Sequence, residues 1–162
     1  MAQSEQKETH SLGNVNHDQA NLVLRLYEER REARLREARE WFIAHYHPRT
    51  PEDTATLAPP GSRENANVRM MTSYWGMVAA IVNRGLIDEE FFYETSGGEL
   101  WIVWERLKAV APEMRKRMKN PHAWAGIERL AAGFEAWREK NAPGSNDAMR
   151  QMMAAPAAAR KS

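Results

Sequence analysis

Cysteine is the first residue type that this 162-residue sequence lacks. Its absence excludes a disulfide framework, a thiolate metal site and a thiol nucleophile. Glycine is scarce too, with nine residues, whereas a β-rich chain needs many glycines in its tight turns. We therefore expect a helical protein, and 162 residues suffice for one domain with a hydrophobic core.

An excess of charge of one sign is also missing. The 23 basic and 22 acidic residues give a net charge of +1, so no global field attracts a nucleic acid or an anionic membrane. The uncharged run from Met70 to Asn83 is shorter than the roughly 20 residues that cross a bilayer. The polar N-terminal sequence contains no apolar core of a secretory signal. These features predict a cytoplasmic protein without a transmembrane segment.

Motifs of common enzyme classes are absent as well. The sequence has no P-loop, no dinucleotide glycine fingerprint, no HExxH, no GxSxG, and no ExxH pair of the kind that holds di-iron sites in helical bundles. His45 and His47 would point to different sides of a helix, so they do not converge on one ion. We predict no catalytic residues, no cofactor and no metal site.

What the sequence does contain is a series of segments with helical character. Residues 17–46 include no glycine or proline and predict one long helix. Residues 47–62 include four prolines, which block helix continuation, and predict a loop or connector. Residues 1–16 are polar and predict a disordered arm, while residues 143–162, rich in Ala, Pro and Met, predict a flexible tail with room for one helical turn around Met149 to Met153.

The predicted helix from Arg63 to Arg84 has two apolar stripes one residue out of step. The first stripe consists of Val68, Met71, Trp75, Val78 and Val82. The second stripe consists of Met70, Tyr74, Met77 and Ile81. Together they form an apolar arc that is wider than that of an ordinary surface helix. Either this helix is the centre of the bundle, or its second stripe contacts another chain.

Capping residues in the segment that follows indicate where one helix ends and the next begins. Gly85 can adopt the left-handed conformation that ends a helix, and Asp88 can cap the next one. After Ser96–Gly98, we expect a further helix to start near Glu99.

Proline and tryptophan mark the C-terminal half. Pro112 predicts a kink or a restart near Lys108, because proline removes a backbone donor. Asn120 as N-cap and Pro121 at the first helical position predict the start of the last helix. Trp101 lies off the apolar stripe of its helix, and two alternatives remain open: it packs on the flank of the bundle, or it is exposed at a binding surface.

A basic cluster lies close to a predicted helix C-terminus. It consists of Arg115, Lys116, Arg117 and Lys119. Basic side chains are favourable at this end of the helix dipole, which is one explanation of the cluster. A patch that contacts phosphate groups is the other.

Three stretches, "YWGMVAAIVNRGLIDEEFFYE", "GGELWIVWERLKAVAPEMRKR" and "NPHAWAGIERLAAG", resemble a family of bacterial helical domains of unknown function. The resemblance covers Tyr74 to Gly133. It implies an apolar helix that ends in a Gly-Leu-Ile-Asp turn, then a tryptophan-centred helix and a last helix. It implies no activity and no catalytic residues.

These observations predict an all-α bundle of four main helices plus one short helix, forming a single domain over residues 17–142. The predicted function is a non-enzymatic scaffold or protein-interaction module, which self-associates through the second stripe. The alternative is a weak binder of nucleic acid or another phosphate surface through the basic cluster. An enzyme would instead require a polar pocket around one of Glu99, Glu105, Tyr74 or His122.

Overall fold

The computed structural model of the chain describes residues 15–154, and the described part is all-helical, with no strand. The predicted fold class is therefore confirmed, but the bundle consists of more and shorter helices than the four main ones expected. The helices are α1 (His17–Arg30), α2 (Ala33–His45), α3 (Pro51–Leu57), α4 (Arg63–Asn83), α5 (Glu89–Phe92), the π-helix η1 (Tyr93–Gly97), α6 (Gly98–Leu107), α7 (Ala111–Arg117), α8 (Ala125–Asn141) and α9 (Ser145–Ala154).

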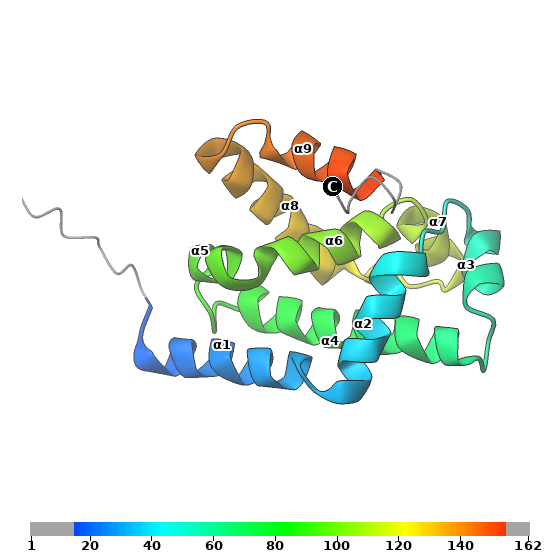
Figure 1. The fold of residues 1–162 in the computed structure, drawn as a ribbon, viewed down its shortest axis with the longest axis horizontal. Helices are drawn as coiled ribbons and strands as arrows, with labels where there is room; N and C mark the ends of the chain where they lie inside the picture. The colour runs from blue at the N-terminus through cyan, green and yellow to red at the C-terminus, as the bar shows by residue number, and fades with distance from the viewer. Residues whose placement is uncertain (1–14, 155–162) are drawn as a thin grey trace, which may run out of the picture.

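Helix α4 lies at the centre and packs against α2, α6 and α8 (Figure 1). Its first apolar stripe faces the core: Met71, Trp75, Val78 and Val82 are buried, and Val68 is half-buried. The predicted caps at its far end are confirmed. Gly85 has a φ of +77°, and the Asp88 carboxylate accepts a hydrogen bond from the Phe91 backbone N–H (3.0 Å) at the start of α5.

The single long helix predicted over residues 17–46 is wrong, because the chain breaks between α1 and α2. The Glu32 side chain caps α2 by accepting a hydrogen bond from the Leu35 backbone N–H (3.0 Å). The break lets α1 lie along α4 while α2 crosses it (Figure 1). As a result, Leu26 of α1 and Phe42 of α2 are both buried.

The predicted connector over residues 47–62 contains the short helix α3. A capping box starts this helix: the Thr50 hydroxyl accepts from the Asp53 backbone N–H (3.3 Å), and the Asp53 carboxylate accepts from the Thr50 backbone N–H (2.9 Å). Pro51 occupies the first turn, where its missing donor costs nothing. The prediction of a loop or connector, based on four prolines, is therefore wrong for Pro51–Leu57.

The expected interruption at Ser96–Gly98 is also wrong, because α5, η1 and α6 form one continuous helical segment with a π-helical turn. The two glycines keep helical backbone angles. Gly97 is needed because the ring of Phe134 on α8 lies against its Cα, where a Cβ would overlap it. Gly133 on α8 lies in the same way against the Tyr93 hydroxyl. Glycine on each helix therefore admits an aromatic ring from the other.

Further along, the restart predicted at Pro112 is confirmed, since α6 ends at Leu107 and α7 begins at Ala111. The last predicted start is wrong by a few residues. Pro121 lies in a turn, and α8 begins at Ala125 after Trp124, whose φ is 58°.

The C-terminal segment has more structure than the sequence predicts. Instead of a single helical turn, residues 145–154 form helix α9, which lies beside α8 (Figure 1). The predicted disordered arm falls outside the described residues except for its last two positions, and the end of the predicted tail falls outside them entirely.

Candidate interaction surfaces

The second apolar stripe of α4 lines a groove between α4, α1 and the start of α2, with a volume of about 630 Å³. We call it the α1–α4 groove. All four predicted interface residues are brought together there with three leucines of the first two helices. The apolar lining consists of Leu22, Leu26, Leu35, Met70, Tyr74, Met77 and Ile81. Met77 is 47% exposed, so part of this stripe is open to solvent rather than packed in the core.

Tyr74 fixes one wall of the groove. Its hydroxyl donates a hydrogen bond to the Leu26 carbonyl oxygen (2.7 Å), which ties α4 to α1. A tyrosine hydroxyl is a neutral donor at physiological pH, and burial raises the pKa of Tyr74 further, to about 12. Tyr74 therefore has a structural role at the groove.

Charges of both signs border the groove. The Arg25 guanidinium contacts the Glu29 carboxylate (3.1 Å) along α1. Glu32 lies at the break before α2, and hydrogen bonds from the backbone N–H groups of Arg34 and Leu35 hold its pKa below the usual value. The border of the groove thus carries charges of both signs, from one arginine and two glutamates.

The exposed face of α4 beside Met77 carries small residues. Ser73 and Ala80 are exposed, and Gly76 is half-buried. A Cβ added at Gly76 would meet no atom within 4 Å, so no contact within the described chain requires this glycine. The helix backbone is therefore accessible at this position.

The basic cluster is largely engaged in contacts within the chain. The Arg115 guanidinium donates to the Ala123 carbonyl oxygen (2.9 Å) and to the Glu128 carboxylate (2.6 Å), which fixes α7 to the start of α8. Arg117 donates to Glu52 (2.6 Å) and thereby fixes α7 to α3.

The two lysines of the cluster lie on the solvent side. The Lys116 ammonium is 3.5 Å from the Glu113 carboxylate, in an exposed pair. Lys119 is exposed, with a φ of 50° just after α7. The structure thus assigns cross-helix contacts to the two arginines and leaves the lysines at the surface.

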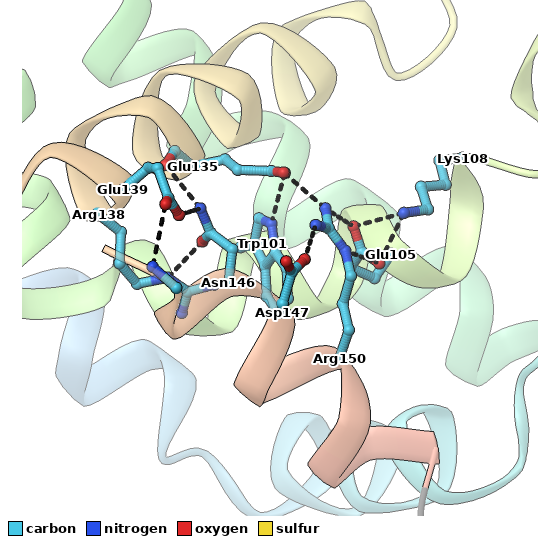
Figure 2. A network of polar contacts seen from close by, with 10 residues as sticks. Trp101, Glu105, Lys108, Glu135, Arg138, Glu139, Asn146, Asp147 and Arg150 are labelled. Carbon is cyan, nitrogen blue, oxygen red and sulfur yellow. Dashed lines mark hydrogen bonds and ion pairs between the residues drawn. The ribbon is translucent and has the colours of Figure 1, made fainter. Parts of the chain in front are cut away.

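Trp101 is fully buried, which contradicts the alternative of an exposed tryptophan. Its Nε1 donates a hydrogen bond to the Glu135 carboxylate of α8 (3.1 Å), and the guanidinium of Arg138 lies 4.3 Å from the centroid of its ring. Figure 2 shows that this tryptophan lies within a network of polar side chains from α6, α8 and α9.

The sequence did not single out Arg150 and Asn146, the α9 residues at the centre of this network. Arg150 bridges Glu105 of α6 and Glu135 of α8. Asn146 is only 5% exposed and contacts α8. Glu105 lies 45 residues before Arg150, so no local pattern predicts that contact.

Of the four residues named for the enzyme alternative, Glu105 lines a hollow of about 640 Å³ together with Arg106 and Arg150. Glu99 pairs with Arg30 (2.7 Å), and Glu105 pairs with Lys108 (2.7 Å). Tyr74 makes the contact with α1 described above, and His122 is exposed.

Residues 15–154 contain neither a metal-binding cluster nor a membrane-spanning helix. No group of three or more His, Asp or Glu side chains in this part of the chain could hold a metal ion. Nor is any helix within it long and apolar enough to span a membrane.

Comparison with known proteins identifies the domain but not an activity. Residues 17–137, from α1 into α8, match the family model described as "Domain of unknown function (DUF4760)". The chain belongs to this family. The predicted resemblance to a helical family of unknown function is confirmed, and the DUF4760 match extends beyond Tyr74 to Gly133 to include α1, α2 and α3. Neither the curated proteins nor the solved structures include a match.

Proposed function

We propose that this DUF4760 domain is a non-enzymatic helical scaffold that self-associates through the α1–α4 groove. One observation carries the proposal: the second stripe of α4 is gathered with leucines of α1 and α2 into one apolar groove at the surface. A contiguous apolar surface of this kind is typical of an interaction site in a soluble protein.

The charges at the border favour a second copy of the chain as the occupant. A two-fold interface places the same surface of both copies face to face, so it must be complementary to itself. The groove is bordered by Arg25 as well as by Glu29 and Glu32. Arg25 of one copy can therefore meet a carboxylate of the other without repulsion between like charges.

The small residues on α4 support close contact between two copies. Glycine inside a helix costs roughly 0.5 to 1 kcal/mol relative to alanine. Gly76 carries this cost with no neighbour that requires it. Together with Ser73 and Ala80, it would allow a second α4 to approach the helix backbone.

Apolar burial would favour such a dimer. If the contact removes roughly 300 to 500 Å² of apolar surface on each chain from water, it would contribute on the order of 15 to 25 kcal/mol before the cost of association is subtracted. Met77, the most exposed member of the stripe, would lie near the middle of such a contact.

The test is molar mass by light scattering across a dilution series of the full chain. We expect a dimer in the wild type and a monomer in Met77→Glu, because a carboxylate in the apolar groove would be desolvated without a partner. Met152→Glu is the matched control, since Met152 is 63% exposed on α9, outside the groove, and should leave the dimer intact. A monomeric wild type, or a dimer that persists in Met77→Glu, would contradict the proposal.

The alternative, a binder of nucleic acid or another phosphate surface, has less support. Arg115 and Arg117 donate to carboxylates at 2.6 Å, and a phosphate would have to compete with these contacts. Such a binder would lose affinity steeply as salt concentration rises. Absence of binding to a DNA or RNA duplex at low salt would exclude it.

A further inference from the structure

Helix α9 contacts the rest of the domain in the way a bound peptide helix contacts its groove. Asn146 contacts α8, Arg150 contacts α6 and α8, and Met149 and Met153 pack against the hydrophobic core. Their spacing of i, i+3, i+4 and i+7 is the anchor pattern of an amphipathic helix bound to another protein. The opposite face is polar or exposed, including Met152.

Arg150 is the central anchor. Its Nη2 donates to the Glu135 carboxylate (2.7 Å) and to Glu105 (3.2 Å), and its Nε donates to the second oxygen of Glu105 (3.3 Å). The guanidinium also lies 5.2 Å from the centroid of the Trp101 ring. Two carboxylates and an aromatic ring thus form an arginine-binding site (Figure 2).

Asn146 is the second polar anchor, one turn before Arg150. Its Oδ1 accepts a hydrogen bond from the Arg138 Nε (2.7 Å), and its Nδ2 donates to the Glu135 carbonyl oxygen (3.0 Å) and to the Glu139 carboxylate (3.2 Å). Asn146 is only 5% exposed, and both polar atoms of its side-chain amide have hydrogen-bond partners.

The electrostatics of the site depend on the guanidinium. Burial opposes ionisation of Glu135, but hydrogen bonds from Arg150 and Trp101 outweigh it and hold the pKa of Glu135 below its usual value. The Glu105 side chain is only 8% exposed, so without Arg150 its charge would be paired with Lys108 alone among the ion pairs seen here. The site therefore favours the presence of an arginine.

The position of α9 in the chain distinguishes it from the other helices. The family match ends at residue 137, before α9 begins at Ser145. A short link through Pro143 and Gly144, whose φ is +82°, connects α9 to α8. Because the anchors are largely polar, their hydrogen bonds can be exchanged for those of water or of another helix at a smaller cost than for a core helix.

We propose that the surface of Trp101, Glu105, Glu135, Arg138 and Glu139 on α6 and α8 is a binding site for an arginine-bearing amphipathic helix of another protein, which α9 occupies in cis. We call it the α9-docking surface. Helix α9 acts as a tethered competitor, so an external helix binds only to chains whose α9 has left.

The contacts define the ligand chemistry. The partner helix presents an asparagine at i, an arginine at i+4 and apolar side chains at i+3 and i+7. Lysine at i+4 is a poor substitute, because an ammonium cannot donate through two fixed N–H groups to both carboxylates. An acidic side chain at i+4 is rejected by Glu105 and Glu135.

The experiment uses the full chain and a fluorescent, end-capped peptide of residues 143–154. In Asn146→Ala/Arg150→Ala, which weakens the cis contacts, we expect saturable binding of the wild-type peptide. Because apparent affinity falls with the fraction of sites that are open, the wild-type chain should bind the same peptide at least about tenfold more weakly. A Met152→Ala chain is the control and should behave as wild type, since Met152 faces solvent.

Peptide variants test the arginine site itself. Arg150→Lys in the peptide should weaken binding at least about tenfold, and Arg150→Ala should abolish it. Equal affinity for all three peptides, or equal affinity of the wild-type and doubly substituted chains, would overturn the proposal.

Hydrogen exchange on the wild-type chain gives a reading that does not depend on a variant's folding. Excess peptide should speed exchange of the α9 amides while leaving those of α6 slow. If α9 stays equally protected at peptide concentrations at which the wild-type chain binds the peptide, or if no peptide effect occurs with either chain, α9 is a structural helix and the inference fails. The groove proposal is unaffected either way, since its readout is molar mass.

Discussion

The contact between Gly97 and Phe134 can be tested by stability measurements. Alanine substitutions at the adjacent Gly97 and Gly98 should change the free energy of unfolding in opposite directions. In Gly97→Ala, the new Cβ would overlap the Phe134 ring. That ring has little freedom to move, since Tyr93 (5.8 Å between ring centroids) and Trp137 (5.9 Å) pack against it. In Gly98→Ala, the new Cβ would lie 4.0 Å from the nearest Phe134 atom, which is an ordinary contact.

The magnitudes follow from two opposing contributions. Overpacking of a core costs about 1 to 3 kcal/mol, and alanine regains roughly 0.5 to 1 kcal/mol over glycine inside a helix. We expect Gly97→Ala to lower the free energy of unfolding by about 1 to 2 kcal/mol. Gly98→Ala should raise it by up to about 1 kcal/mol. At roughly 2 to 4 °C per kcal/mol for a chain of this size, the two Tm values should differ by several degrees.

The assay is thermal and urea denaturation followed by circular dichroism, with both variants and the wild type at the same chain concentration. Equal concentrations are needed because self-association would shift all three Tm values. A Gly97→Ala chain at least as stable as wild type would refute the packing argument. So would two variants that shift in the same direction by the same amount.

Three further outcomes follow from contacts of single side chains. Gly133→Ala should destabilise the fold, and adding Tyr93→Phe should recover part of the loss, because the hydroxyl that lies against Gly133 is then absent; additive effects in the double-mutant cycle would contradict this. Tyr74→Phe should cost about 0.5 to 1.5 kcal/mol and speed hydrogen exchange in α1, because the bond to the Leu26 carbonyl is lost; unchanged exchange would refute it. Burial raises the pKa of Tyr46, Tyr74 and Tyr93 to about 12, so the folded state favours their neutral form. This contribution to the free energy of unfolding is complete below pH 10 and is lost as pH rises through 12. Tyrosinate absorbance that develops fully near pH 10 would contradict this.

Local signals in the sequence predicted the features that depend on local chemistry. The first stripe of α4 is buried because a helix places residues 3 and 4 apart on one face. Gly85 and Asp88 end and start helices, and Pro112 forces a restart, through backbone preferences that act within a few residues. The same reasoning identified the second stripe that lines the α1–α4 groove.

Features that depend on tertiary contacts were not predictable in this way. Nothing in the sequence breaks the helix near Glu32, since the segment contains no glycine or proline. The break follows from the requirement that Leu26 and Phe42 both be buried around the same α4 helix. Residues 47–62 contain Thr50 and Asp53 at the spacing of a capping box, but the four prolines in the same segment indicated a loop or connector instead.

Helix α9 illustrates a more general difficulty. Its anchors, Asn146 and Arg150, are residue types that usually face water, so composition alone cannot distinguish a free tail from a helix docked by polar contacts. Only the i, i+3, i+4, i+7 spacing of Asn146, Met149, Arg150 and Met153 carries the information.

The positions of the two surfaces are compatible with a scaffold that binds a second copy and a partner helix at the same time. The α1–α4 groove lies on one side of the bundle, whereas α9 lies on the other side, with α6 between them (Figure 1). A second copy in the groove would therefore not cover the α9-docking surface, and a helix at that surface would not cover the groove. Each site could then be occupied independently, so a dimer would present two α9-docking surfaces and bind bivalent partners with increased avidity.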